Sequence, residues 1–150
     1  MMYGLIKCCS IREIAEEVCL ALGGNEDVVN ILVETAGAET NHGLVKDTTK
    51  EAGMGLTQFD KMPFYDVRNR TSAANTQRVM DYFGIDIEWV EWEELRYNPL
   101  LALIFTRLKY KLIPEAIPKT LEGRAKYWKK WYNSLLGKGT IEHYIDANKG

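Results

Sequence analysis

The chain has 150 residues, of which 46% are hydrophobic and 27% are charged, and its net charge is −2. These values are typical of a globular protein with a buried core. The longest apolar run covers residues 99–105, far fewer than the ~20 residues of a membrane-spanning helix. We therefore expect one domain over residues 1–150, without insertion into a membrane.

The first residues lack the apolar core and the cleavage site of a secretory signal peptide. We therefore expect synthesis in the cytoplasm without a signal peptide. The three cysteines, Cys8, Cys9 and Cys19, form no disulfide framework, because their number is odd and two are adjacent. Adjacent cysteines rarely ligate one tetrahedral metal, even with His42 or His143 nearby. We expect neither a metal nor another cofactor.

Charge is distributed unevenly along the chain. Residues 81–98 have a net charge of −5 and residues 106–139 a net charge of +7. A basic segment fits an anionic polymer such as nucleic acid or a bacterial wall, or simply a solvated helix face. Because no helix-turn-helix or RNA-binding motif is present, we expect no nucleic-acid partner.

Two helices are predicted at the start of the chain. Apolar residues recur at helical spacing over residues 11–22, and Gly23 and Gly24 end this helix. Asn25 is placed to cap a second helix. The apolar stripe of that helix comprises Val28, Ile31, Leu32, Thr35 and Ala38. The same spacing continues to Glu39 on the inward face.

The middle of the chain is less regular. Residues 40–70 show little periodicity and contain Gly43, Gly53, Gly55 and Pro63, which favours a loop or short strands. A further helix is predicted over residues 72–83, ending at Gly84. Residues 85–92 are acidic and aromatic, and are expected to form a short helix or a linker.

The last part of the chain is expected to supply the core. Asn98 and Pro99 start a helix that is apolar nearly all round, as expected of a central buried helix. A basic, aromatic helix follows over residues 120–132, and Thr140 opens a short last helix. The expected fold is mainly α, with several short helices around one buried central helix. A small irregular or β region is expected between the second and third helices.

Glu39 is the main candidate for chemistry. It is a carboxylate at the end of a helix suited to burial, and Gln58 follows nineteen positions later in the glycine-rich residues 53–59. Burial would raise its pKa, so that it could act as a general acid near neutral pH. Glu34 is the rival acid, but it lies off the apolar stripe, where it could reach solvent. An ordinary helix-end carboxylate is the simpler alternative for Glu39.

Three short motifs resemble those of a known family. Ala38-Glu39-Thr40 is similar to the Glu-Ser of lytic transglycosylases, and Gly53-Met54-Gly55-Leu56-Thr57-Gln58-Phe59 to their Gly-Leu-Met-Gln segment. Tyr132-Asn133 is similar to their late Tyr-Asn. Residues 120–140 look like the C-terminus of phage-borne members. The chain thus resembles the lysozyme-like superfamily, in particular lytic transglycosylases and phage peptidoglycan-degrading enzymes.

The resemblance implies a single α+β lysozyme-like catalytic domain that cleaves the β-1,4 bond between N-acetylmuramic acid and N-acetylglucosamine. Glu39 would be the general acid/base, and the substrate-binding residues would be Thr57, Gln58, Tyr132 and Asn133. Trp128 and Trp131 could offer apolar faces to sugar rings, although tryptophans at three-residue spacing more often belong to the core. The partner would be peptidoglycan glycan strands, with the protein a monomer. It would be made in the cytoplasm of a bacterial host and act on the wall, as an endolysin at lysis or as a virion component at entry.

Two alternatives stay open. A hydrolytic muramidase would need a second carboxylate to activate water, and the candidates are Asp47, Glu51, Asp60 and Asp66. The departures from the family pattern leave the product undecided: Thr57 replaces a methionine, Ser134 follows Tyr-Asn in place of glycine, and the loop is about one residue longer. A non-catalytic wall-binding or phage tail structural protein is the other alternative.

Overall fold

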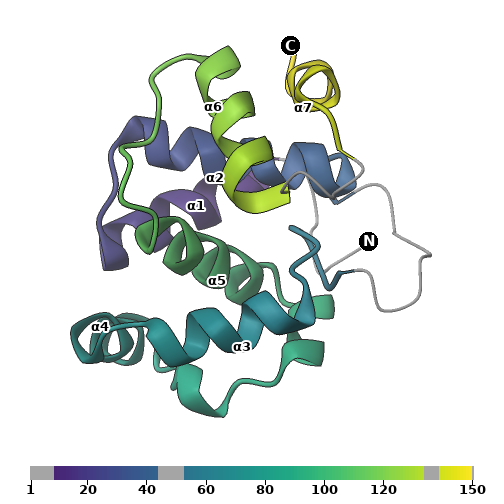
Figure 1. The fold of residues 1–150 in the computed structure, drawn as a ribbon. Coiled ribbons are helices and arrows are strands. Elements are labelled where there is room, and N and C mark those ends of the chain that lie inside the picture. Colours follow the sequence, from purple (N-terminus) through teal and green to yellow (C-terminus); the bar gives the residue numbers. More distant parts are fainter. Residues whose placement is uncertain (1–8, 44–52, 134–138, 150) are drawn as a thin grey trace.

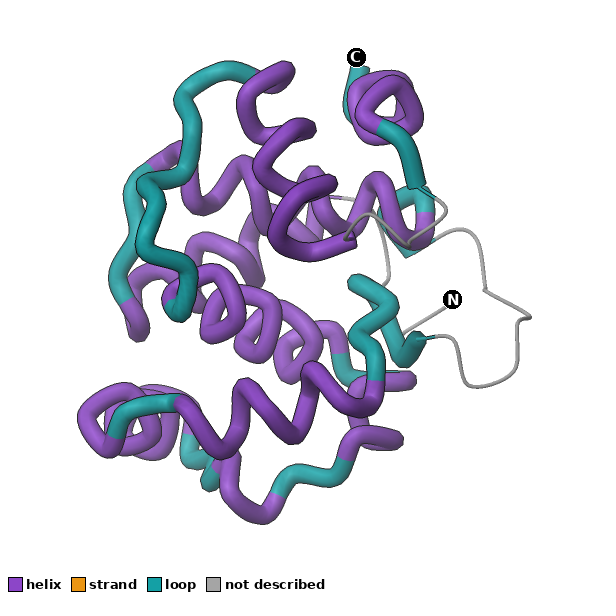
Figure 2. Tube along the Cα trace, viewed as in Figure 1, coloured by secondary structure: helices purple, strands orange, loops and turns teal. Residues whose placement is uncertain are grey.

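The computed structural model describes residues 9–43, 53–133 and 139–149, and within them the chain is mainly α-helical. Cys8, Asp47 and Glu51 lie outside the described residues. Figure 2 shows helices joined by loops and no strand in the described part, where Met54 and Phe59 form an isolated antiparallel bridge. The prediction of a mainly α fold is therefore confirmed. The helices are α1 (Cys9–Leu22), α2 (Glu26–Thr40), α3 (Lys61–Arg70), α4 (Ala73–Phe83), α5 (Pro99–Lys111), α6 (Leu121–Trp128) and α7 (Ile141–Ala147), with 3-10 helices η1 (Ile87–Trp89) and η2 (Trp92–Arg96) and a π-helical turn η3 (Lys129–Asn133).

Helix α5 lies at the centre of the molecule, with α3 and α4 on one side and α1, α2 and α6 on the other (Figure 1). Asn98 caps it by accepting a hydrogen bond from the Leu101 amide at 3.1 Å, and Pro99 stands in the first turn. Residues 101–108 are all buried. The central buried helix is confirmed. In the described part of the chain, no helix has both the length and the apolar character to cross a membrane.

Local signals at the helix ends were predicted correctly. The side chains of Asn25, Ser72, Thr120 and Thr140 each accept a hydrogen bond from a backbone amide in the first turn of the helix that follows. Gly84 ends α4 in the left-handed conformation, with φ 69°. These contacts stay within a few residues of the chain, so the sequence alone indicates them.

The prediction of a loop or short strands over residues 40–70 is wrong for its last third, which is helix α3. Pro63 is compatible with this helix because it lies in the first turn, where a backbone N–H has no helical partner. Phe64 and Val67, one turn apart, are buried. The ring of Phe64 stacks on Phe105 of α5 with centroids 4.4 Å apart. This tertiary contact stabilises α3 despite its weak apolar pattern.

Some of the basic residues after position 105 form hydrogen bonds within the protein rather than only facing solvent. Arg107 donates through Nε to the carbonyl of Gly23 at 2.9 Å, and Lys111 donates to the carbonyl of Leu22 at 2.9 Å. Both carbonyls end helix α1, where cations are favourable. The positive charge of residues 106–139 therefore partly serves to cap a helix.

A buried ion pair joins the C-terminal helices to α2. Glu34 accepts two hydrogen bonds from Arg124 of α6, at 2.7 and 2.9 Å, and a third from the hydroxyl of Tyr144 of α7 at 2.8 Å. The side chains of Glu34 and Arg124 are 13% and 7% exposed. The expectation that Glu34 could reach solvent is wrong, because the carboxylate is enclosed by its partners from α6 and α7.

We predict that Glu34→Gln lowers the free energy of unfolding by about 3 kcal/mol, because buried Arg124 would lose its close, doubly bonded anion and keep only Asp27, 3.9 Å away. Chemical denaturation measures this loss. Glu16→Gln on the exposed face of α1 is the matched control and should change stability by less than about 0.5 kcal/mol. Equal stability of the two variants would contradict the structural role of Glu34.

Candidate active site

The end of α2 holds Glu39 in a fixed position. The three residues that follow the helix, Asn41, His42 and Gly43, all have positive φ, at 49°, 58° and 85°. The amides of Asn41 and His42 donate to the carbonyls of Gly37 and Ala36 at 3.0 and 3.1 Å. These bonds satisfy the last carbonyls of the helix. The last helical turn, which carries Glu39, is therefore well ordered.

Thr40 connects this helix end to the glycine-rich residues 53–59. It is buried, and its hydroxyl donates to the carbonyl of Leu56 at 2.7 Å and accepts from the amide of Gly43 at 2.9 Å. A buried carbonyl needs such a donor, because an unpaired one costs stability. The residue next to Glu39 thus sets the distance between α2 and residues 53–59.

Residues 53–59 form a tight turn. Met54 and Phe59 exchange backbone hydrogen bonds at 3.0 and 3.1 Å, and the amide of Gln58 donates to the carbonyl of Gly55 at 3.0 Å. Gly55 has φ 78°, and a Cβ atom there would collide with the carbonyl oxygen of Leu95 in η2. The glycine is required by both the backbone conformation and this close approach.

The carboxylate of Glu39 contacts Trp128. Glu39 is half-buried, and its Oε2 accepts a hydrogen bond from the indole Nε1 of Trp128 at 3.1 Å. Trp128 is 1% exposed and packs on Tyr144 with ring centroids 5.2 Å apart. Of the two alternatives for Trp128, the core position is confirmed and the open face for a sugar is not, because the ring is enclosed. Its role at the site is to donate a hydrogen bond to the candidate acid.

Tyr132 contacts residues 53–59 from the opposite side. Its buried hydroxyl donates to the carbonyl of Thr57 at 2.8 Å. Burial raises the pKa of Tyr132, and the nearby charge of Glu39 raises it further, so the phenol stays neutral. The side chain of Thr57 is fully buried, and its hydroxyl lies 2.8 Å from that of Thr106. Tyr132 and Thr57 are therefore buried parts of the site, where their hydrogen bonds support its structure.

The other two predicted binding residues, Gln58 and Asn133, make different contacts. Gln58 is half-buried, has φ 47°, and donates through Nε2 to the carbonyl of Gly55 at 2.9 Å. A left-handed glutamine is strained, and such strain is frequent at functional sites. Asn133 accepts a hydrogen bond from Lys129 at 2.8 Å, within the π-helical turn. The structure brings Glu39, Thr57, Gln58 and Tyr132 together, whereas the contact described for Asn133 stays in its own turn.

Trp128 and Tyr132 reach the site from one continuous stretch, because α6 runs directly into the π-helical turn η3. The wider π turn lets the two side chains, four residues apart, contact α2 and residues 53–59 respectively. Such turns are frequent at functional sites. The sequence predicts a continuous helix here but does not indicate the change in its winding.

Lys109 of α5 also faces the site and was not singled out from the sequence. Its ammonium lies 4.3 Å from the centroid of the Tyr132 ring and 5.5 Å from that of Phe59. Burial lowers the pKa of Lys109, and the negative charges of Asp60, Glu39 and Asp66 oppose this. The available sequence signal was a lysine beside the apolar residues of a predicted core helix, which also contains Arg107 and Lys111.

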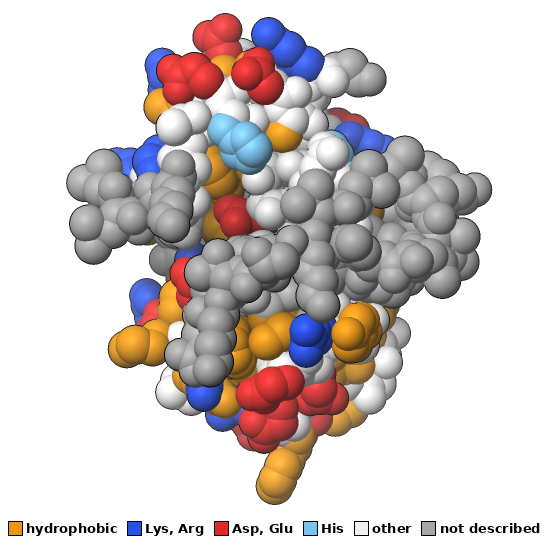
Figure 3. Space-filling view, turned by 90° about the vertical axis from the view of Figure 1, so that its right-hand side faces the viewer, with side chains coloured by type: hydrophobic (Ala, Val, Ile, Leu, Met, Phe, Trp, Pro, Cys, Tyr) orange, Lys and Arg blue, Asp and Glu red, His pale blue; other side chains and the backbone are white. Residues whose placement is uncertain are grey.

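Figure 3 views the molecule from the side on which residues 53–59 and the end of α2 lie. Acidic side chains gather at the upper and lower parts of this face, and a further acidic side chain is recessed between them. A histidine lies on the upper part. In the structure, His143 of α7 lies with Nε2 2.7 Å from the carbonyl of Ala38, directly before Glu39. Helix α7 thus also supports the end of α2.

His42 is half-buried, and burial lowers its pKa. Among the residues that the structure describes, no group of histidine, cysteine, aspartate and glutamate is arranged to hold a metal ion.

No protein-family model, curated protein or solved structure matches this chain. The functional assignment therefore rests on the arrangement of these side chains.

We predict that Gly55→Ala lowers the free energy of unfolding by more than about 2 kcal/mol, because the new methyl group meets the Leu95 carbonyl in a strained backbone conformation. Gly84→Ala is a matched control, since Gly84 has φ 69° and open space around it. It should cost only the backbone strain, about 1 kcal/mol. Thermal or chemical unfolding compares them, and equal losses would mean that η2 does not confine the turn.

Proposed function

We propose that this protein is a lysozyme-like enzyme that cleaves peptidoglycan glycan strands between N-acetylmuramic acid and N-acetylglucosamine, as a lytic transglycosylase. The observation that carries the proposal is the convergence of three segments distant in the sequence. Buried hydrogen bonds join the end of α2, through Thr40, and Tyr132 to the turn of residues 53–59, and Glu39 is bonded to Trp128 beside them. These are the segments on which the family resemblance depends.

In the proposed reaction, protonated Glu39 donates its proton to the glycosidic oxygen as an oxocarbenium-like centre develops. The resulting carboxylate then takes a proton from the C6 hydroxyl of the muramic acid, whose oxygen closes an anhydro ring. The indole N–H of Trp128, 3.1 Å from Oε2, stabilises the carboxylate between these steps. One carboxylate is sufficient for this sequence, and the acid is regenerated at its end.

We expect Glu39→Gln to lower the rate of clearing of purified cell walls by at least about 100-fold, because general acid catalysis is lost. The substitution is isosteric, so thermal unfolding should change little. Glu16→Gln, exposed on α1, serves as the control and should clear walls at the wild-type rate. If Glu39→Gln clears walls as fast as the wild type, Glu39 is not the acid.

If the folded wild type binds walls in a pelleting assay but does not clear them, the non-catalytic alternative is correct instead. The protein would then be a wall-binding or phage tail structural component. Release at lysis and action from a virion at entry are both compatible with the proposed activity.

A hydrolytic muramidase is the second candidate, and one observation favours Asp60 as its second carboxylate. The charges of Asp60 and Glu39 both raise the pKa of Tyr132 and both oppose the lowering of the Lys109 pKa, so the two carboxylates lie within electrostatic reach of the same side chains. Asp66 acts on Lys109 alone and also pairs with Arg70 at 3.1 Å. A water molecule activated by Asp60 would complete the hydrolysis.

Mass spectrometry of digested peptidoglycan separates the two reactions. We expect anhydro-muramyl ends from the wild type and from Asp60→Asn, at rates within a few-fold of each other, because no second carboxylate is required. Reducing muramic acid ends, together with loss of activity in Asp60→Asn, would identify a muramidase. Reducing glucosamine ends would refute the assignment of the bond.

A further inference from the structure

The side chain of Lys109 is held in an aromatic setting within the candidate site. Besides facing the rings of Tyr132 and Phe59, its ammonium lies 3.5 Å from the carbonyl oxygen of Tyr132, to which it donates. The two rings contact each other edge to face, with centroids 5.9 Å apart. Cations are attracted to such ring faces, more strongly when water is excluded. The ammonium therefore has a defined place between α5 and η3.

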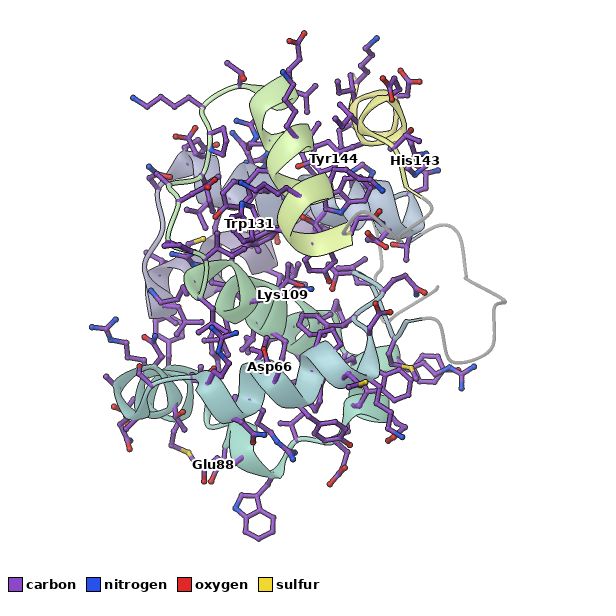
Figure 4. All side chains as sticks on the ribbon, viewed as in Figure 1. Asp66, Glu88, Lys109, Trp131, His143 and Tyr144 are labelled. Carbon is purple, nitrogen blue, oxygen red and sulfur yellow. The ribbon has the colours of Figure 1, made fainter. Side chains whose placement is uncertain are left out.

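The negative charges of three carboxylates act on this ammonium. Asp60 directly precedes α3, Glu39 lies on α2 and Asp66 on α3, and each opposes the lowering of the Lys109 pKa by burial. Figure 4 shows Lys109 on the side of α5 that faces α6, with Asp66 below it on α3. The field of one half-buried cation thus acts on several anions.

Two tyrosines that face Glu39 are uncharged in the working pH range. Tyr110 of α5 and Tyr132 of η3 are both buried, and burial together with the charge of Glu39 raises the pKa of each above its ordinary value. Trp128 of α6 donates a neutral N–H. Lys109 therefore supplies positive charge to the environment of Glu39, whereas the other groups supply dipoles or, as Asp60 does, negative charge.

We propose that Lys109 is a positioning residue whose ammonium stabilises the Glu39 carboxylate formed when the proton leaves. This inference rests on the proposed function and goes beyond it, since it assigns a role to a cation outside the three motifs. Protonated Glu39 must release its proton to the glycosidic oxygen and then exist as an anion until it recovers one. A cation fixed by two aromatic rings favours that anion without touching the substrate.

The first test compares the pH dependence of wall clearing in the wild type, Lys109→Met and Lys109→Arg. Because removal of the cation destabilises the carboxylate, the pKa of Glu39 should rise, and the fall in activity at high pH should move upward by about one unit. The maximum rate should also decrease. Lys109→Arg keeps the positive charge, so its activity should fall at the same high pH as that of the wild type. Lys126→Met, exposed on α6, is the control and should leave the profile unchanged.

A second measurement does not require activity. The indole Nε1–H resonance of Trp128 reports the ionisation of Glu39, because it donates to that carboxylate. Its titration midpoint should rise in Lys109→Met relative to wild type, stay in place in Lys109→Arg, and disappear in Glu39→Gln. If Lys109→Met does not fold, Lys109→Gln replaces it, since a neutral amide can still donate to the Tyr132 carbonyl.

These experiments distinguish a failure of the role of Lys109 from a failure of the proposed function. An unchanged midpoint in a folded, neutral Lys109 variant would overturn the role of Lys109, even if the wild type cleaves walls. A shifted midpoint in a protein whose Glu39→Gln variant clears walls normally would leave the electrostatic coupling intact and refute the proposed function.

Discussion

Two consecutive backbone carbonyls, those of Leu56 and Thr57, receive hydrogen bonds from buried hydroxyl groups, and the candidate site depends on this constraint. Thr40 donates to the first at 2.7 Å and Tyr132 to the second at 2.8 Å. Since a buried carbonyl without a donor is costly, the end of α2 and the π turn after α6 must both stay in contact with residues 53–59. Glu39 and Trp128 are brought together as a consequence.

The two glutamates of α2 differ in role because their partners differ. Glu34 is neutralised by Arg124 and bonded to Tyr144, which makes it a structural link between three helices. Tyr144 in turn packs on Trp128, whose indole N–H contacts Glu39. The buried ion pair thus orients the donor of the candidate acid, while the acid itself is half-buried and lies beside neutral donors and one shared cation.

Helical phase and capping chemistry were sufficient to predict the central helix and the capped helix starts from the sequence, and they favoured Glu39 over Glu34 as the candidate acid. A cap such as Asn98 acts within three residues of itself. An apolar stripe likewise indicates which face is buried, whatever it packs against. The spacing from Glu39 to Gln58 was also readable, because the motifs follow one another along the chain.

Only the tertiary structure decided what the remaining side chains do. Helix α3 exists because Phe64 packs on Phe105, Trp128 is a hydrogen-bond donor because it is enclosed beside Glu39, and Lys109 faces the site because the rings of Phe59 and Tyr132 meet over α5. Each of these roles depends on a partner at least 23 positions away, as in the contact of Lys109 with Tyr132. Periodicity and caps carry information on neighbours in the chain, whereas burial and charge are set by neighbours in space.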